Sequence, residues 1–242
     1  MKNNYIKYNF IDNKKRPLML IFPGGGYEYT SPREADPVAE FFNQNGYHTG
    51  IVYYKEVELK HPFLIENIIE IIRDGSKNKL ISDLLVIGFS AGGHLAMHVM
   101  TRIPKKIKAG ILAYSVITPD PKYYHRNSFV RLLIDPTDKK ALREVSMEKQ
   151  VKNNMPPIFI WHTVTDAVVP VENSILLFNA LKKKGNSVEL HLFESGRHAL
   201  GLANRYTPFP DMDPIQFEED NKRVAIWTIL AINWLDAVLK NK

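Results

Sequence analysis

The residues Gly88-Phe89-Ser90-Ala91-Gly92 have the types and spacing of a turn that carries a nucleophile. An apolar run at 84–89 precedes Ser90 and small and apolar residues follow it, so the serine is expected between a strand and a helix. Such a tight turn strains the serine backbone, and glycine at 88 and 92 removes side chains that would collide. The turn also places the hydroxyl at a helix N-terminus, near backbone donors and the positive end of the helix dipole. The pattern predicts a nucleophilic serine and not a plain glycine-rich turn.

A serine hydroxyl needs a base to take its proton, and the base needs a group that orients it. In folds with this kind of turn, the order along the chain is serine, acid, histidine. Asp166 follows the apolar run 157–163, and His198 follows the run 188–193. Both residues therefore fall on turns after expected strands, and we predict that Ser90, Asp166 and His198 form a catalytic triad.

The other acidic and histidine residues fit these roles less well. Three competing carboxylates lie in an irregular stretch and do not directly follow a strand, namely Asp120, Asp135 and Asp138. His162 and His191 fall within expected strands and should pack or hydrogen-bond there, whereas His125 is placed where it could reach a substrate.

His94 and His98 have the i, i+4 spacing of zinc ligands on a helix. The residues between them lack the glutamate of an H-E-x-x-H motif, and no third ligand suggests itself. We therefore expect both histidines to pack within the helix layer, and we predict no metal site.

The run Pro23-Gly24-Gly25-Gly26-Tyr27 follows the apolar run 18–22. Glycines allow backbone N–H groups to approach a developing oxyanion closely, and the N–H of Ala91 should supply a further donor. A phosphate-binding loop is disfavoured, because no Gly-Lys-Ser/Thr sequence follows the glycines.

Composition excludes several other classes of protein. The 242 residues are 45% hydrophobic and 24% charged, which is typical of a globular protein, and the absence of cysteine excludes disulfides and thiolate catalysis. The net charge of +6 comes from scattered basic residues in short runs, so we expect no nucleic-acid partner. No stretch resembles a secretory signal or approaches 18 apolar residues, so we expect a cytoplasmic protein without membrane contact.

Short apolar runs alternate with amphipathic ones along the whole sequence, which predicts a mainly parallel sheet with helices on both faces. The expected strands are 18–22, 49–54, 84–89, 109–115, 157–163 and 188–193; the expected helices run from a capping box at Ser31–Glu34 to near Gly46, and over 62–74, 91–100, 171–184 and 217–240. No composition break divides residues 1–242, so we expect one α/β domain. The irregular stretches 116–150 and 199–216 are candidate walls of a pocket.

Four segments together resemble the α/β-hydrolase superfamily, and more narrowly small bacterial acetyl esterases related to acetylxylan esterases: PGGGYEYTSPREADPVAEFF, GFSAGGHLA, PPIFIWHTVTDAVVPVENS and LFESGRHALGLA. The resemblance implies an α/β-hydrolase fold with a minimal lid. It also implies Ser90 as nucleophile, Asp166 as acid and His198 as base, with Gly25, Gly26 and Ala91 as oxyanion donors. Related esterases often have histidine where this chain has Pro23, a change that leaves the backbone donors available.

The function expected from these residues is a serine carboxylic-ester hydrolase that works without metal or organic cofactor. It would remove short acyl groups, acetyl first, from small or carbohydrate esters, and Tyr27, His125 and Phe129 are candidate substrate contacts. An exopeptidase-like or formamidase activity on the same triad is an alternative, because fold alone does not choose the substrate. A non-catalytic binding protein on the same scaffold is an alternative of another class.

Overall fold

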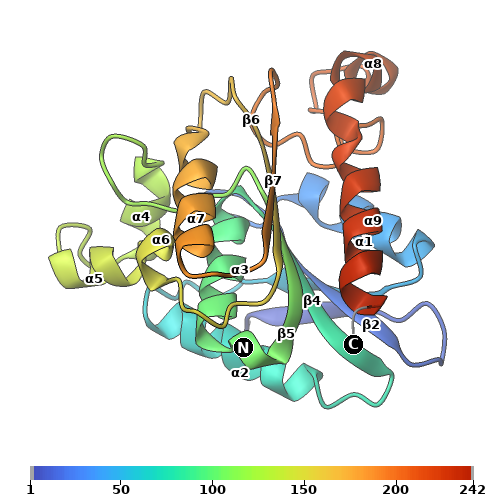
Figure 1. Ribbon diagram of the computed structural model, residues 1–242, viewed down its shortest axis with the longest axis horizontal. Helices are drawn as coiled ribbons and strands as arrows, with labels where there is room; N and C mark the ends of the chain where they lie inside the picture. Colours follow the sequence, from blue (N-terminus) through green and yellow to red (C-terminus); the bar gives the residue numbers. More distant parts are fainter. Residues whose placement is uncertain (1–2, 241–242) are drawn as a thin grey trace.

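A seven-stranded sheet forms the centre of the computed structural model, which describes residues 3–240 (Figure 1). The strand order is β1-β3-β2-β4-β5-β6-β7, and β1 pairs antiparallel with β3 whereas the other neighbours are parallel. The strands are β1 (Tyr5–Asn9), β2 (Arg16–Phe22), β3 (His48–Tyr53), β4 (Ile81–Phe89), β5 (Ile107–Ala113), β6 (Ile158–Thr163) and β7 (Val188–Phe193). The central strands are almost wholly buried because helices cover both of their faces.

Each face of the sheet has its own helix layer and apolar core (Figure 1). The layer with α2, α3 and α7 covers one face, and α1 and α9 cover the other. The helices are α1 (Asp36–Gln44), α2 (Phe63–Gly75), α3 (Ser90–Arg102), α4 (Arg126–Leu132), α5 (Lys139–Glu144), α6 (Met147–Gln150), α7 (Glu172–Lys183), α8 (Pro214–Ala225) and α9 (Trp227–Lys240), with 3-10 turns η1 (Pro32–Glu34) and η2 (Pro104–Lys106). Within residues 3–240, no helix is long and apolar enough to cross a membrane.

The predicted fold class is confirmed, and the departures from it are local. The alternating exposure of β1 at the sheet edge was too weak a signal to predict that strand. The expected helix over 217–240 is two helices, which meet at Ile226. The stretch 116–150 contains the short helices α4 to α6.

The predicted capping box at Ser31–Glu34 is wrong. The chain makes the 3-10 turn η1 there and the α-helix begins at Asp36, so Glu34 is not in the first turn of an α-helix and Ser31 makes no side-chain cap. Glu34 points inward, where its carboxylate accepts hydrogen bonds from the backbone N–H of Gly24 and the hydroxyl of Tyr114, both at 2.7 Å. The polar side chain that resembled a cap is therefore part of the interior.

The close approach of α3 to the end of β2 gives a first prediction. A Cβ at Gly92 would collide with the backbone carbonyl oxygens of Phe22 and Pro23, so Gly92→Ala should lower the free energy of unfolding by about 3 kcal/mol or more. Gly185→Ala is the matched control, because Gly185 has φ 72° but open space around its Cβ position, and should cost about 1 kcal/mol. Urea unfolding of both variants measures the difference, and equal losses would contradict the packing explanation.

Candidate active site

The predicted nucleophile turn is present at the end of β4. The strand ends at Phe89, α3 begins at Ser90, and Ser90 has the positive φ of 51° that is uncommon for a residue with a side chain. A Cβ at Gly88 would lie only 2.6 Å from the Cα of Gly93, so glycine is required on this side of the turn as it is at Gly92. The strain at Ser90 is therefore maintained by close backbone packing on both sides of the turn.

The structure brings Ser90, His198 and Asp166 into one hydrogen-bonded chain. The Oγ of Ser90 lies 2.8 Å from Nε2 of His198, and Nδ1 of His198 lies 2.6 Å from Oδ2 of Asp166. Asp166 follows β6 and His198 follows β7, so both come from the carboxyl edge of the sheet at which Ser90 also lies. A carboxylate can only accept, so Nδ1 carries the proton and Nε2 is left to accept from the serine hydroxyl.

Asp166 is held in its ionised form by several donors. Its Oδ1 accepts from the backbone N–H groups of Val168 and Val169, both at 2.9 Å, and its Oδ2 accepts from His198 and from Nε2 of His162 at 3.2 Å. Burial opposes ionisation, but the hydrogen bonds from His162 and His198 outweigh it and lower the pKa of Asp166 well below its ordinary value. At neutral pH the carboxylate is therefore available to stabilise a charged imidazole.

His162 was predicted only to pack or hydrogen-bond within its strand, and the sequence did not indicate its contact with Asp166. Its Nε2 faces two acceptors, Oδ2 of Asp166 and the carbonyl of Val169 at 3.0 Å, so Nε2 carries the proton. Its Nδ1 accepts from the hydroxyl of Ser174 at 2.8 Å. The fully buried ring therefore bonds to the same carboxylate oxygen as His198 and helps to hold Asp166 in place. The spacing of four residues between His162 and Asp166 was the only signal in the sequence.

Two hydrogen bonds to backbone carbonyl oxygens hold the glycine-rich loop after β2 in place. The hydroxyl of Tyr54 donates to the carbonyl of Pro23 at 2.6 Å, and the Gly24 carbonyl accepts from the N–H of Ser31 at 3.1 Å. Gly25 and Gly26 have φ of 118° and 61°, and within residues 3–240 their N–H groups bond to no protein acceptor. These two groups are therefore free to bind an oxygen in front of Ser90.

The N–H of Ala91 is the third predicted oxyanion donor. Ala91 is the second residue of α3, and N–H groups in the first turn of a helix have no acceptor within that helix. The N-terminus of α3 also contributes the positive end of its dipole beside the serine oxygen.

A cavity of about 620 Å³ opens over Ser90 and His198 at this edge of the sheet. Its walls come from the glycine-rich loop, η1, α4 and the residue before it, the loop after β6 and the segment after His198: Gly25, Gly26, Glu28, Tyr29, Ser31, Pro32, Arg33, Glu34, His125, Asn127, Arg131, Val168, Ala199, Phe209 and Pro210. The stretches 116–150 and 199–216 thus each contribute a wall. Glu28 and Arg131 form an ion pair of 2.6 Å at the cavity, which makes this part of the wall polar.

Of the three candidate substrate contacts, only His125 lines the cavity. Tyr27 is buried and its hydroxyl bonds to Nδ1 of His94 at 2.7 Å, whereas Phe129 packs edge-on against the same imidazole at 5.5 Å between ring centres. Nε2 of His94 bonds to the carbonyl of Val145. Burial lowers the pKa of His94 to about 4, so the ring is a neutral part of the core. Tyr27 and Phe129 are therefore core residues, and the prediction that they touch substrate is corrected.

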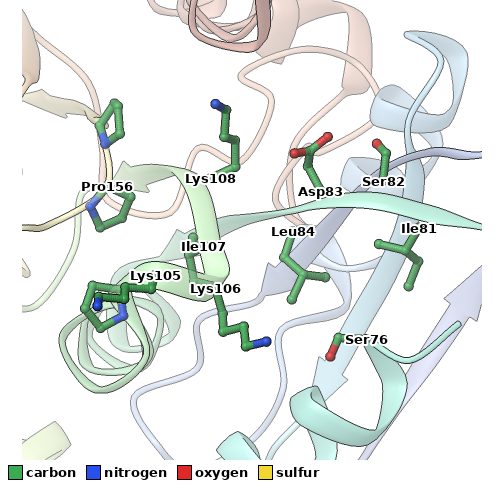
Figure 2. Close-up of a pocket in the computed structure, with 12 residues that line it drawn as sticks. Ser76, Ile81, Ser82, Asp83, Leu84, Lys105, Lys106, Ile107, Lys108 and Pro156 are labelled. Atoms are coloured by element: carbon green, nitrogen blue, oxygen red, sulfur yellow. The ribbon is translucent and has the colours of Figure 1, made fainter. Parts of the chain in front are cut away.

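A second hollow lies at the opposite edge of the sheet, where β4 and β5 begin (Figure 2). It is lined by Asp83, Ser82 and the short basic run 105–108, and Figure 2 shows the side chain of Lys106 directed away from that of Asp83. No histidine is among its lining residues. Within residues 3–240, the hydrogen-bonded chain of Ser90, His198 and Asp166 lies at the carboxyl edge and not at this hollow.

Comparison with known proteins agrees with this geometry. The profile of the prolyl oligopeptidase family matches residues 65–208, a segment that contains Ser90, Asp166 and His198. The chain belongs to this family. The predicted resemblance to acetyl-esterase-like α/β-hydrolases is also confirmed.

Two curated relatives and one crystal structure are especially informative. The chain is 38% identical over 224 residues to endo-1,4-beta-xylanase B of Butyrivibrio fibrisolvens, covering 83% of this chain and 35% of that protein. It is 30% identical over 203 residues to an acetylxylan esterase of Xylanibacter ruminicola, covering 79% and 42% respectively. The chain thus spans less than half the length of these curated relatives.

The crystal structure is that of an acetyl ester-xyloside bifunctional hydrolase from Caldicellulosiruptor lactoaceticus. It has a TM-score of 0.83 and 32% identity, covering 97% of this chain and 88% of that one. The relatives of this member of the prolyl oligopeptidase family therefore support the class of enzyme that the motifs predict, a serine esterase.

The orientation of His198 by Asp166 gives a second prediction. Asp166→Asn should leave the fold in place but lower kcat for p-nitrophenyl acetate by about 10⁴-fold, because the imidazole loses the partner that fixes its tautomer. Steady-state kinetics on the folded variant measures this loss.

Asp135→Asn is the matched control, because the carboxylate of Asp135 accepts from Thr137 at an exposed position outside the cavity. This variant should keep the kcat of the wild type. An active Asp166→Asn enzyme beside an inactive Asp135→Asn enzyme would move the acid role into the segment 116–150.

Proposed function

We propose that this chain is a serine esterase that removes short acyl groups, acetyl above all, from small or carbohydrate esters. The observation that carries the proposal is the unbroken chain of hydrogen bonds from Ser90 through His198 to Asp166, beneath a cavity lined by unpaired backbone donors. We further propose that the chain acts as one α/β-hydrolase domain. A cytoplasmic location remains a prediction from the sequence.

The proposed reaction has two half-reactions with an acyl-enzyme between them. His198 takes the proton of Ser90 as Oγ attacks the ester carbonyl, and the N–H groups of Gly25, Gly26 and Ala91 bind the oxyanion that forms. The imidazolium then protonates the departing alcohol, which leaves the acyl group on Ser90. Water, deprotonated by His198, attacks this acyl-enzyme and releases the acid. Every proton and bond in the cycle is handled by the chain's own groups, so the proposal needs no metal or cofactor.

The walls of the cavity favour a polar leaving group. Glu28, Asn127 and Arg131 offer donors and acceptors at one side, and His125 adds a half-buried imidazole whose pKa is lowered by burial and by the neighbouring His198. Ligand pockets combine mainly apolar walls with a few polar groups that fix the orientation of the ligand, and such polar groups can bind the hydroxyls of a sugar. The names of the acetylxylan esterase and the acetyl ester-xyloside hydrolase support an acetylated carbohydrate as the substrate class.

The first test of the proposal is covalent labelling. A fluorophosphonate probe should label the wild-type protein at Ser90, because the serine is activated by His198 and the oxyanion donors stabilise the phosphonyl adduct. Ser90→Ala should abolish labelling and lower kcat by about 10⁶-fold while the protein stays folded. Absence of labelling in the folded wild type would support the alternative of a non-catalytic binding protein.

The second test concerns the size of the acyl group. An apolar acyl channel would gain about 0.8 kcal/mol for each methylene it buries, so kcat/KM would rise along an ester series. The cavity over Ser90 has a volume of only about 620 Å³, and the Glu28–Arg131 ion pair occupies part of its wall, so we expect it to exclude long acyl chains and kcat/KM to fall from p-nitrophenyl acetate through butyrate to octanoate. A maximum at octanoate would discard the short-acyl proposal.

The family name makes peptide substrates the main alternative, and a panel that adds formyl amides and aminoacyl amides tests it directly. Turnover of an aminoacyl amide above that of every ester would favour an exopeptidase-like activity. Fast turnover of a formyl amide would favour a formamidase.

A further inference from the structure

Glu34 is a buried carboxylate in the wall of the active-site cavity that the proposed reaction does not use. Its residue is 1% exposed, and its carboxylate oxygens bind two different partners. Oε2 accepts from the backbone N–H of Gly24, the residue before the two oxyanion glycines, and Oε1 accepts from the hydroxyl of Tyr114. One side chain therefore connects the oxyanion loop to the end of β5.

Tyr114 carries this connection to the loop of the proposed base. Its hydroxyl oxygen accepts from the backbone N–H of Gly201 at 2.9 Å, and its ring packs against the imidazole of His198 with ring centres 5.1 Å apart. Burial, followed by the charge of Glu34, raises the pKa of Tyr114 well above its ordinary value. The hydroxyl thus stays protonated and donates to Glu34 while it accepts from Gly201.

Arg33 makes the same connection from the neighbouring position of η1. Its guanidinium donates to the backbone carbonyl oxygens of Ala199 at 3.0 Å, Thr207 at 2.5 Å and Pro208 at 2.7 Å. It also lies 4.0 Å from the ring centre of Phe209. The turn η1 is therefore hydrogen-bonded to the segment after His198 through Arg33 and to the oxyanion loop through Glu34.

We propose that Glu34 is a positioning residue that sets the distance between the oxyanion donors and His198 through the chain Gly24–Glu34–Tyr114–Gly201. The proposal rests on the proposed esterase function, since it concerns the transition state of that reaction. The donors on the loop after β2 and the imidazole after β7 belong to elements that are distant in the sheet, with β4, β5 and β6 between them. A chain of contacts across this distance keeps the oxyanion donors and the imidazole of His198 correctly placed around the same tetrahedral intermediate.

Burying the carboxylate of Glu34 beside the proposed oxyanion site costs free energy, which favours a role for it in the reaction. A carboxylate near the place where a negative oxygen forms repels that oxygen, and a buried carboxylate without a cation in contact is expensive unless donors satisfy it. Glu34 has one donor on each oxygen: Gly24 belongs to the loop of the proposed oxyanion donors, and Tyr114, at the end of β5, contacts the segment that carries His198.

The experiment compares Glu34→Gln with Tyr114→Phe in steady-state hydrolysis of p-nitrophenyl acetate. The glutamine amide offers one acceptor oxygen where the carboxylate offers two, so either Gly24 or Tyr114 loses its acceptor. We expect kcat to fall by about 10- to 100-fold, because a displaced oxyanion donor is felt in the transition state. KM should change by no more than about twofold, because ground-state binding does not need that donor. Tyr114→Phe keeps the ring against His198 but removes the hydroxyl, so its kcat should fall by a similar factor.

The double variant supplies the decisive measurement. If Glu34 and Tyr114 act through one chain of hydrogen bonds, Glu34→Gln combined with Tyr114→Phe should be about as slow as the slower single variant. Glu148→Gln is the control, because Glu148 is a second largely buried carboxylate, bonded to Thr118 and outside the cavity lining, and it should keep the kcat of the wild type. Thermal unfolding of each variant reports stability separately.

Three results would overturn the proposal. The first is that folded Glu34→Gln and Tyr114→Phe both keep the kcat of the wild type. The second is that the fold-losses of kcat of the two single variants multiply in the double variant. The third is that Glu148→Gln loses as much kcat as Glu34→Gln. Failure of the esterase function itself would look different, because the wild type would then neither hydrolyse the esters nor react with fluorophosphonate. If Glu34→Gln does not fold, Tyr114→Phe alone decides by the same split between kcat and KM.

Discussion

The packing of α3 against the end of β2 is the constraint on which the rest of the site depends. The Cα of Gly92 lies so close to the carbonyl oxygens of Phe22 and Pro23 that no side chain fits between them. This contact brings the N-terminus of α3, with Ser90 at a φ of 51°, close to the glycine-rich loop. The proposed nucleophile follows β4 and the proposed donors Gly25 and Gly26 follow β2, and the direct backbone contact between Gly92 and the end of β2 holds these two turns together.

The other half of the site depends on electrostatics and not on sterics. Asp166 is largely removed from water, and its ionised form persists because four donors face its two oxygens. Two of these donors are backbone N–H groups of the turn that carries it, and the others are His162 and His198. The bond from His162 fixes the carboxylate, and the carboxylate in turn fixes the imidazole. The orientation of His198 therefore depends in part on His162, whose ring Ser174 holds by a hydrogen bond at Nδ1.

Much of the fold and the core of the site could be predicted from the sequence because the signals are local. Buried parallel strands are short apolar runs, and the turn around Ser90 requires its two glycines within five residues. The positions of Asp166 and His198 followed from the rule that ligand-facing loops succeed parallel strands. What failed was the assignment of side chains whose environment is set by distant segments. Tyr27 follows the glycine loop in sequence but turns into the core toward His94, which is 67 residues away.

The same reason explains why Glu34 was misinterpreted. A serine followed three residues later by a glutamate is a local pattern typical of a helix start, and the helix does begin nearby, at Asp36. The partners that decide the role of Glu34 lie 10 and 80 residues away, at Gly24 and Tyr114. A capping glutamate would lie at the surface, where its charge is solvated, whereas this one is enclosed and must be satisfied by donors. One of those donors, Gly24, lies on the glycine-rich loop, and the other, Tyr114, bonds to the segment after His198, so satisfying one buried charge also ties these two segments to each other.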